Sequence, residues 1–162
     1  MRRAITFAAC IVVGVIMVGS LPVSGQTKDP RIGRWQLNVT KSTFTGTPPK
    51  SITRLYEDRG GGIVLYTGTT VTPTGTNVTL VLYKLDGKEY AQVPRDAETV
   101  TVVSQRLADA HTIEAVTKAN GKVVSTFTQV VSADGKTLTY TPKDPQGKPT
   151  GVVQVFDRQG TT

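Results

Sequence analysis

The stretch GRWQLNVTKSTF, residues 33–44, decides how the rest of the chain is interpreted. It opens an alternating run and contains Trp35, the only tryptophan of the sequence, two residues after a glycine. Alternation places Trp35, Leu37 and Val39 on one face of an extended strand and polar residues on the other. The stretch therefore predicts a first strand over residues 33–40 with one buried face.

The chain beyond this stretch keeps the same rhythm of short strands and turns. Runs rich in Val, Thr, Ile and Tyr are separated by turn sequences such as LDGK (85–88), ANGK (119–122) and SADGK (132–136). Asn-Gly and Asp-Gly supply the positive φ angles that tight hairpin turns require. No window of eleven or more residues after position 25 shows apolar residues at helical spacing. We expect ten strands, at 33–40, 51–58, 63–71, 77–84, 88–93, 98–107, 111–118, 122–131, 136–142 and 151–157.

Consecutive antiparallel strands in one small domain leave two unpaired edges unless the sheet closes on itself. A sandwich would more often require a long crossover connection, which the short turns do not provide. The sequence therefore predicts an all-β fold, a single up-and-down antiparallel β-barrel of eight to ten strands, with little or no helix in the mature chain.

The first 25 residues have the pattern of a secretory signal peptide. Arg2 and Arg3 precede fifteen apolar residues, AITFAACIVVGVIMV, and GSLPVSG then offers a cleavage site between Gly25 and Gln26. The apolar run is shorter than the roughly 20 residues that span a membrane. We expect residues 1–25 to be removed, which leaves no membrane anchor, and 26–162 to form one barrel domain in the periplasm or secreted.

Composition excludes several classes of function. Cleavage would remove Cys10, the only cysteine, and with it any disulfide or cysteine metal ligand. Without Arg2 and Arg3, 17 basic and 12 acidic side chains remain, but no run of five or more like charges marks a nucleic-acid surface. His111 is the only histidine and accompanies no nucleophile motif. We expect no metal site, no cofactor, no nucleic-acid partner and no enzyme activity.

Gly33-Arg34-Trp35 resembles the Gly-x-Trp pattern of the calycins, which include the lipocalins and the fatty-acid-binding proteins. The pattern W-x-LN-x-x-KS-x-F, with YED-x-G, DGK and a closing VFDR, is also similar to small exported bacterial proteins grouped as lipocalin-like. In calycins the tryptophan plugs one end of the barrel beside a basic residue of the last strand. The resemblance therefore implies that Trp35 and Arg158 form a barrel-end plug, with the guanidinium over the indole face.

The chain also departs from these relatives. Fatty-acid-binding proteins insert two helices between the first two strands, whereas TKSTFTGTPPK (40–50) is too short for a helical pair. Their carboxylate clamp, Arg-x-Tyr in the last strand, is matched here by Gln154-Val155-Phe156. That clamp therefore cannot hold a ligand in this protein.

Four polar strand residues are the candidates for ligand binding in the lumen: Arg54, Tyr56, Gln105 and Arg106. A ligand with one polar end needs only a few converging polar groups in an otherwise apolar wall. The alternative is that each is an ordinary surface residue, since tyrosines favour strands and strand arginines usually face solvent. Several strands are apolar on both faces, which leaves their inward face undecided and is compatible with a homodimer.

Three hypotheses follow, in decreasing order of support. The first is non-catalytic binding of a small hydrophobic or amphipathic ligand in the lumen, as a carrier or sensor. The second is a module with a filled barrel that binds a protein or an envelope polymer. The third is an enzyme, which would require a cluster of buried ionisable groups.

Overall fold

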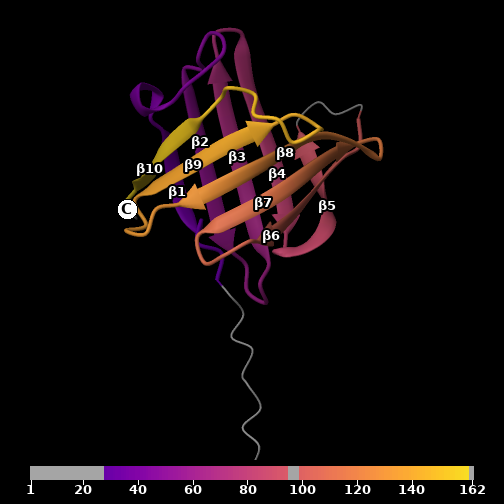
Figure 1. The fold of residues 1–162 in the computed structure, drawn as a ribbon. Helices are drawn as coiled ribbons and strands as arrows, with labels where there is room; N and C mark the ends of the chain where they lie inside the picture. Colours follow the sequence, from indigo (N-terminus) through magenta and orange to yellow (C-terminus); the bar gives the residue numbers. More distant parts are fainter. Residues whose placement is uncertain (1–27, 95–98, 161–162) are drawn as a thin grey trace, which may run out of the picture.

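The chain forms a closed antiparallel barrel in which each strand pairs with its neighbours in the sequence and the last strand pairs with the first (Figure 1). The structure is a computed structural model and describes residues 28–94 and 99–160. The signal peptide expected at residues 1–25 lies outside this part. The strands are β1 (Gly33–Leu37), β2 (Ser51–Asp58), β3 (Val64–Thr72), β4 (Gly75–Tyr83), β5 (Asp86–Pro94), β6 (Thr101–Leu107), β7 (Thr112–Ala119), β8 (Lys122–Val131), β9 (Thr137–Lys143) and β10 (Gln154–Gln159).

The expected all-β barrel is confirmed, with ten strands, and β2 and β8 have the expected bounds. The first strand ends three residues early, at Leu37, because the Asn38 side chain accepts a hydrogen bond from the Lys41 N–H at 3.1 Å. This bond folds Val39–Lys41 into a 3-10 turn, η1. Within the described residues η1 is the only helical element, and no helix there is long and apolar enough to cross a membrane.

Barrel closure decides the inward face of the strands that are apolar on both sides. On β4, Val81 and Tyr83 are buried, whereas Leu80 and Leu82 are 40% and 55% exposed. Because side chains alternate along a strand, one buried position fixes the orientation of all the others. The inner set forms the core cluster: Trp35, Leu37, Ile52, Tyr56, Val64, Val81, Tyr83, Val103, Ala115, Val131, Leu138 and Phe156.

An exposed apolar strip remains on the outer face of β4 and β5. It consists of Leu80, Leu82 and Val93, and Leu80 pairs in register with Val93. Neighbouring exposed apolar residues on adjacent strands favour a covering partner more than isolated ones do. A homodimer, with which the two-sided strands are compatible, remains untested, and this strip is a face that it could use.

The up-and-down order sends alternate connections to opposite ends of the barrel. Residues 28–32 and the turns after β2, β4, β6 and β8 lie at one end, which we call the closed end. The connections after β1, β3, β7 and β9 lie at the other end, which we call the mouth. In Figure 1 the indigo start of the described chain lies on the lower side of the barrel, at the closed end.

Candidate functional site

The closed end is built around Trp35, whose side chain is fully buried. Its indole Nε1–H donates to the Arg31 carbonyl at 2.7 Å. The Arg158 guanidinium lies over the indole face, with Cζ 4.1 Å from the ring centroid. Arg158 also donates to the Ile32 and Pro30 carbonyls at 2.6 and 3.1 Å, and to the Gly135 carbonyl. The contact expected between Trp35 and Arg158 is thus present, and it fastens residues 30–32 to the last strand.

The backbone conformation at position 33 and the neighbouring Arg158 side chain require a glycine two residues before Trp35. The φ angle of Gly33 is 126°, a conformation that residues with a side chain rarely adopt. A Cβ at this position would also lie 2.7 Å from Nη1 of Arg158. The Gly-x-Trp pattern is therefore a geometric requirement, because the guanidinium passes directly beside the Gly33 backbone to reach the indole.

Arg31 forms the floor of the lumen, and sequence reasoning missed it. Only 1% of its surface is exposed. Its Nε and Nη2 donate to the two carboxylate oxygens of Asp29 at 3.0 and 2.8 Å. Nη2 also donates to the Tyr83 hydroxyl at 2.7 Å, and Nη1 donates to Gln105 Oε1 at 2.7 Å and to Gln129 Oε1. Every nitrogen of this guanidinium therefore has a partner, and one carboxylate balances its charge.

Electrostatics support a permanent ion pair in this floor. Burial alone would raise the pKa of the Asp29 carboxyl, but the charge and hydrogen bonds of Arg31 outweigh it and hold that pKa below 3.8. Burial raises the pKa of the Tyr83 hydroxyl, so this phenol stays protonated and donates to Asp29 Oδ2 at 2.6 Å. The floor thus combines one negative and one positive group, with no net charge left for a ligand.

A cavity of about 260 Å³ lies above this floor, inside the barrel. Four aromatic rings line it in two pairs: Tyr56 and Tyr66 lie 4.9 Å apart, and Phe127 and Tyr140 lie 5.2 Å apart, centroid to centroid. The remaining lining residues are Arg31, Arg54, Thr79, Val81, Gln92, Val103, Gln105, Thr117, Ser125 and Gln129. The wall therefore combines four aromatic rings and two valines with eight residues that carry polar side chains.

Three of the four expected ligand-binding residues line this cavity, and one does not. Arg54, Tyr56 and Gln105 face inward. Arg106 faces solvent: its side chain is 67% exposed and pairs with Glu114 on the next strand. Placing Arg106 in the lumen was therefore wrong, because it directly follows Gln105 on a strand and adjacent strand residues point to opposite faces. Ligand binding by the other three stays a prediction.

Arg54 separates the inner cavity from a second one at the mouth. The mouth cavity has a volume of about 650 Å³ and is lined by residues 44–49 of the connection after β1, by the turn after β3, and by Ile52, Val152 and Gln154. Both cavities share Arg54, Tyr66 and Tyr140. The Arg54 Cζ lies 4.4 Å from the Tyr140 ring centroid and 4.6 Å from that of Phe156. Its Nη2 donates to Gln154 Oε1 at 3.3 Å.

Gly68 makes room for the tyrosine beside Arg54. It is the register partner of Arg54 on the neighbouring strand, and a Cβ there would overlap the hydroxyl of Tyr66. A glycine inside a strand often marks such a close approach. The Tyr66 ring can therefore lie back against the barrel wall, which keeps the space beside Arg54 open.

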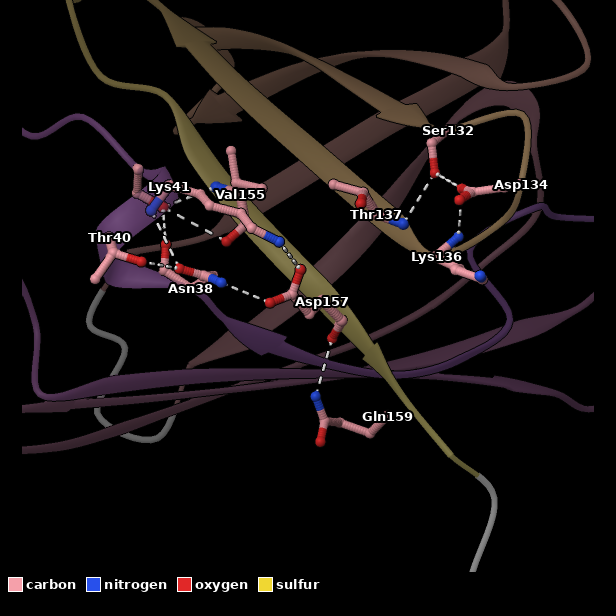
Figure 2. A network of polar contacts seen from close by, with 11 residues as sticks. Asn38, Thr40, Lys41, Ser132, Asp134, Lys136, Thr137, Val155, Asp157 and Gln159 are labelled. Carbon is pink, nitrogen blue, oxygen red and sulfur yellow. Dashed lines mark hydrogen bonds and ion pairs between the residues drawn. The ribbon is translucent and has the colours of Figure 1, made fainter.

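A further set of polar contacts lies outside the barrel, where β1 meets β10 (Figure 2). Asn38 Nδ2 donates to Asp157 Oδ2 at 2.6 Å, and Lys41 Nζ donates to the other carboxylate oxygen at 2.9 Å. Ser42 Oγ accepts from the Val155 N–H at 2.9 Å. The residues of the LN-x-x-KS and VFDR patterns, which carry the sequence resemblance, therefore hold the first and last strands together.

The fold is shared with proteins of known structure. The crystal structure of the wild-type fluorescent protein UnaG superimposes with a TM-score of 0.56 at 20% identity, over 80% of this chain and 97% of that chain. A point mutant of UnaG gives a TM-score of 0.56 at 21% identity, over 82% and 98%. UnaG is a barrel of the fatty-acid-binding-protein family. The fold is calycin-like. No family model matches the sequence, and no curated protein matches it significantly.

The calycin-like barrel carries its lumen polar groups in an arrangement of its own. The last strand presents Gln154 and Phe156 around the cavities in place of an Arg-x-Tyr clamp. The cation instead comes from β2, as Arg54. The connection after β1 contains only η1 and extended chain, so it lines the mouth without covering it by a pair of helices.

Proposed function

We propose that this barrel binds one small hydrophobic or amphipathic molecule in its lumen, as a non-catalytic carrier or sensor outside the cytoplasm. The observation that carries this proposal is the pair of adjoining cavities, of about 260 and 650 Å³, between the Arg31 floor and the mouth. Small-molecule sites typically occupy about 300–1,000 Å³ and are mostly apolar with a few placed polar groups. The two cavities together have a volume of that order, and the four rings supply an apolar surface beside Arg54, although the inner wall carries more polar residues than such sites usually do.

The alternatives receive less support. A module with a filled barrel would need the lumen occupied by its own side chains, whereas the inner cavity reaches down to Arg31. An enzyme would need an ionisable group free to act on a substrate, but Asp29 and Arg31 satisfy one another and His111 is exposed. Among residues 28–94 and 99–160, no three His, Cys, Asp or Glu side chains gather as a metal site would require.

The proposal is tested with N-phenyl-1-naphthylamine, an uncharged dye that fluoresces in apolar surroundings. Purified residues 26–162 should bind the dye saturably, with one molecule per chain. Ser125→Phe places a ring inside the inner cavity and should abolish binding, because Ser125 lines that cavity. Val124→Phe is the matched control, because Val124 is adjacent and 45% exposed.

The outcome is decided by the comparison of these two variants. Loss of dye binding in Ser125→Phe alone supports a lumen site. Absence of saturable binding to the unchanged protein, or equal binding by both variants, would reject the proposal and favour the interaction module. Trp35 emission checks that each variant is folded, since this indole is buried in the closed end.

A further inference from the structure

The two buried arginines of the barrel differ in how their charges are balanced. Arg31 forms an ion pair with Asp29 at 2.8 Å, and all its nitrogens have hydrogen-bond partners. Arg54 is only 9% exposed, yet its polar partners are neutral: it donates to the Gln154 amide at 3.3 Å and otherwise meets tyrosines. Arginine keeps its charge under all physiological conditions. Among the residues that the structure describes, the lumen therefore contains one cation without a counter-ion.

The Nε–H of Arg54 is the donor that lacks a partner in the described part of the chain. It is buried and has no hydrogen-bond partner among the described residues. None of the described residues lining the inner or the mouth cavity is an aspartate or a glutamate, Asp29 being engaged below the floor by Arg31. A buried charge without a partner is strongly unfavourable, so such groups are normally paired or functional. None of the described lining residues therefore supplies the missing charge.

The neighbouring tyrosines cannot supply that charge. Burial raises the pKa of Tyr66 to about 12, even though Arg54 acts in the opposite direction. Burial also raises the pKa of Tyr140. Both phenols are therefore neutral at physiological pH and present hydroxyl groups, which can donate to an oxygen anion placed beside the guanidinium.

The surroundings of Arg54 indicate the kind of molecule that would bring the charge. The contacts with Tyr140 and Phe156 cover the faces of the guanidinium that they meet, so a ligand in the cavities approaches the guanidinium along its edge. Edge-on approach suits an acidic group with oxygens in line with the N–H bonds. One unbalanced charge matches a monoanion better than a phosphate monoester, which carries about −1.5 to −2 at pH 7. The four rings of the inner cavity favour an aromatic body, through stacked or edge-to-face contacts.

We propose that Arg54 is the recognition site for a monoanionic aromatic acid, whose acidic group meets the edge of the Arg54 guanidinium while its ring system lies between the tyrosines and Phe127. This inference rests on the proposed lumen site and adds the charge and shape of its occupant. The guanidinium comes from β2 and reaches Gln154 and Phe156 of the last strand, which carries no Arg-x-Tyr clamp of its own.

A matched pair of dyes tests the charge directly. 1-Anilinonaphthalene-8-sulfonate has the ring skeleton of N-phenyl-1-naphthylamine and adds one negative charge. The unchanged protein should bind the sulfonate about tenfold to a hundredfold more tightly, as expected for charge-assisted hydrogen bonds. Equal or weaker binding of the sulfonate, with the neutral dye still bound, would overturn this inference and leave the lumen site intact. Failure of both dyes to bind would reject the lumen site itself.

Substitution of Arg54 tests the residue. Arg54→Gln should remove the preference for the sulfonate and change binding of the neutral dye less than threefold, which also shows that the cavity is still formed. Arg106→Gln, on the outer surface, should leave both affinities unchanged. Loss of the sulfonate preference in Arg106→Gln, or its retention in Arg54→Gln, would contradict the assignment.

Stability of the ligand-free protein separates a binding role from a structural one. Arg54→Met removes an unbalanced buried charge and should leave the melting temperature unchanged or raise it. Arg31→Met breaks a buried ion pair and should lower it, since Asp29 is then left alone. A fall in Arg54→Met as large as that in Arg31→Met would assign Arg54 to the architecture and overturn the inference.

Discussion

Replacement of Arg158 by alanine should destabilise the barrel by about 3 kcal/mol, because this one side chain contacts the Trp35 ring and three backbone carbonyls of the closed end. A cation–π contact at a partly exposed site contributes about 1 kcal/mol, here with the Trp35 ring 4.1 Å from Cζ. The hydrogen bonds to the Ile32, Pro30 and Gly135 carbonyls add roughly 2 kcal/mol, after a discount for water that can replace the lost donor.

The assay is urea unfolding followed by tryptophan emission. Trp35 is the only tryptophan, so its emission reports this end of the barrel alone. The free energy of unfolding of Arg158→Ala should fall by about 3 kcal/mol, which corresponds to roughly 10 °C in melting temperature for a domain of this size. Its native emission should also move to longer wavelength, because the indole loses the cover of the guanidinium.

Arg106→Ala is the matched control, since Arg106 is also a strand arginine with an ion pair but is 67% exposed. Exposed ion pairs contribute little, and this variant should lie within about 0.5 kcal/mol of the unchanged protein. If Arg158→Ala proved no less stable than Arg106→Ala, the attribution of closed-end stability to Arg158 would be refuted.

Three further substitutions address the floor, the closed end and the cavity. Asp29→Asn should lower the free energy of unfolding by about 3 kcal/mol at pH 7. The pKa of Asp29 is lowered in the folded state, so the stabilisation by this carboxylate is present above pH 3.8 and is lost as the pH falls below that value. The urea unfolding curves of Asp29→Asn and of the unchanged protein should therefore converge in acid. Gly33→Ala should lower the unfolding free energy by about 1–3 kcal/mol through backbone strain, whereas Gly46→Ala, with open space around it and no positive φ, should change it little. Gly68→Ala should push the Tyr66 ring into the lumen and weaken binding of the neutral dye more than it lowers the melting temperature; unaltered dye binding would show that the ring has another place to go.

The strands and their order could be predicted because the signals are local. Asn-Gly and Asp-Gly turns and two-residue alternation each involve only a few neighbouring residues, so they can be recognised without knowledge of the fold. The end of β1 was predicted three residues too late, since the hydrogen bond of the Asn38 side chain to the Lys41 N–H replaces continued strand pairing. The contact between Trp35 and Arg158 could also be predicted. The prediction came from the resemblance of Gly33-Arg34-Trp35 to the calycin pattern and from the location of Arg158 in the last strand.

The candidate site was predictable only in part. Arg54 and Tyr56 stand two residues apart on one strand, so either both or neither could face inward. Gln105 and Arg106 are adjacent, so only one of them could, and the sequence did not say which. Arg31 carried no signal, because it precedes the first strand and looks like a solvated loop cation.

The sequence by itself determined the class of fold, a barrel of eight to ten strands, and the pairing of the first strand with the last, since local turn geometry and the need to remove sheet edges leave few other arrangements. Only the tertiary structure decided which face is the lumen and which charges are balanced. Arg31 finds its carboxylate two residues away and its other partners on β4, β6 and β8, whereas Arg54 faces tyrosines and an amide. Whether a buried charge is balanced depends on side chains that meet across the barrel. These side chains are far apart in the sequence, so their contacts cannot be predicted before the fold is known.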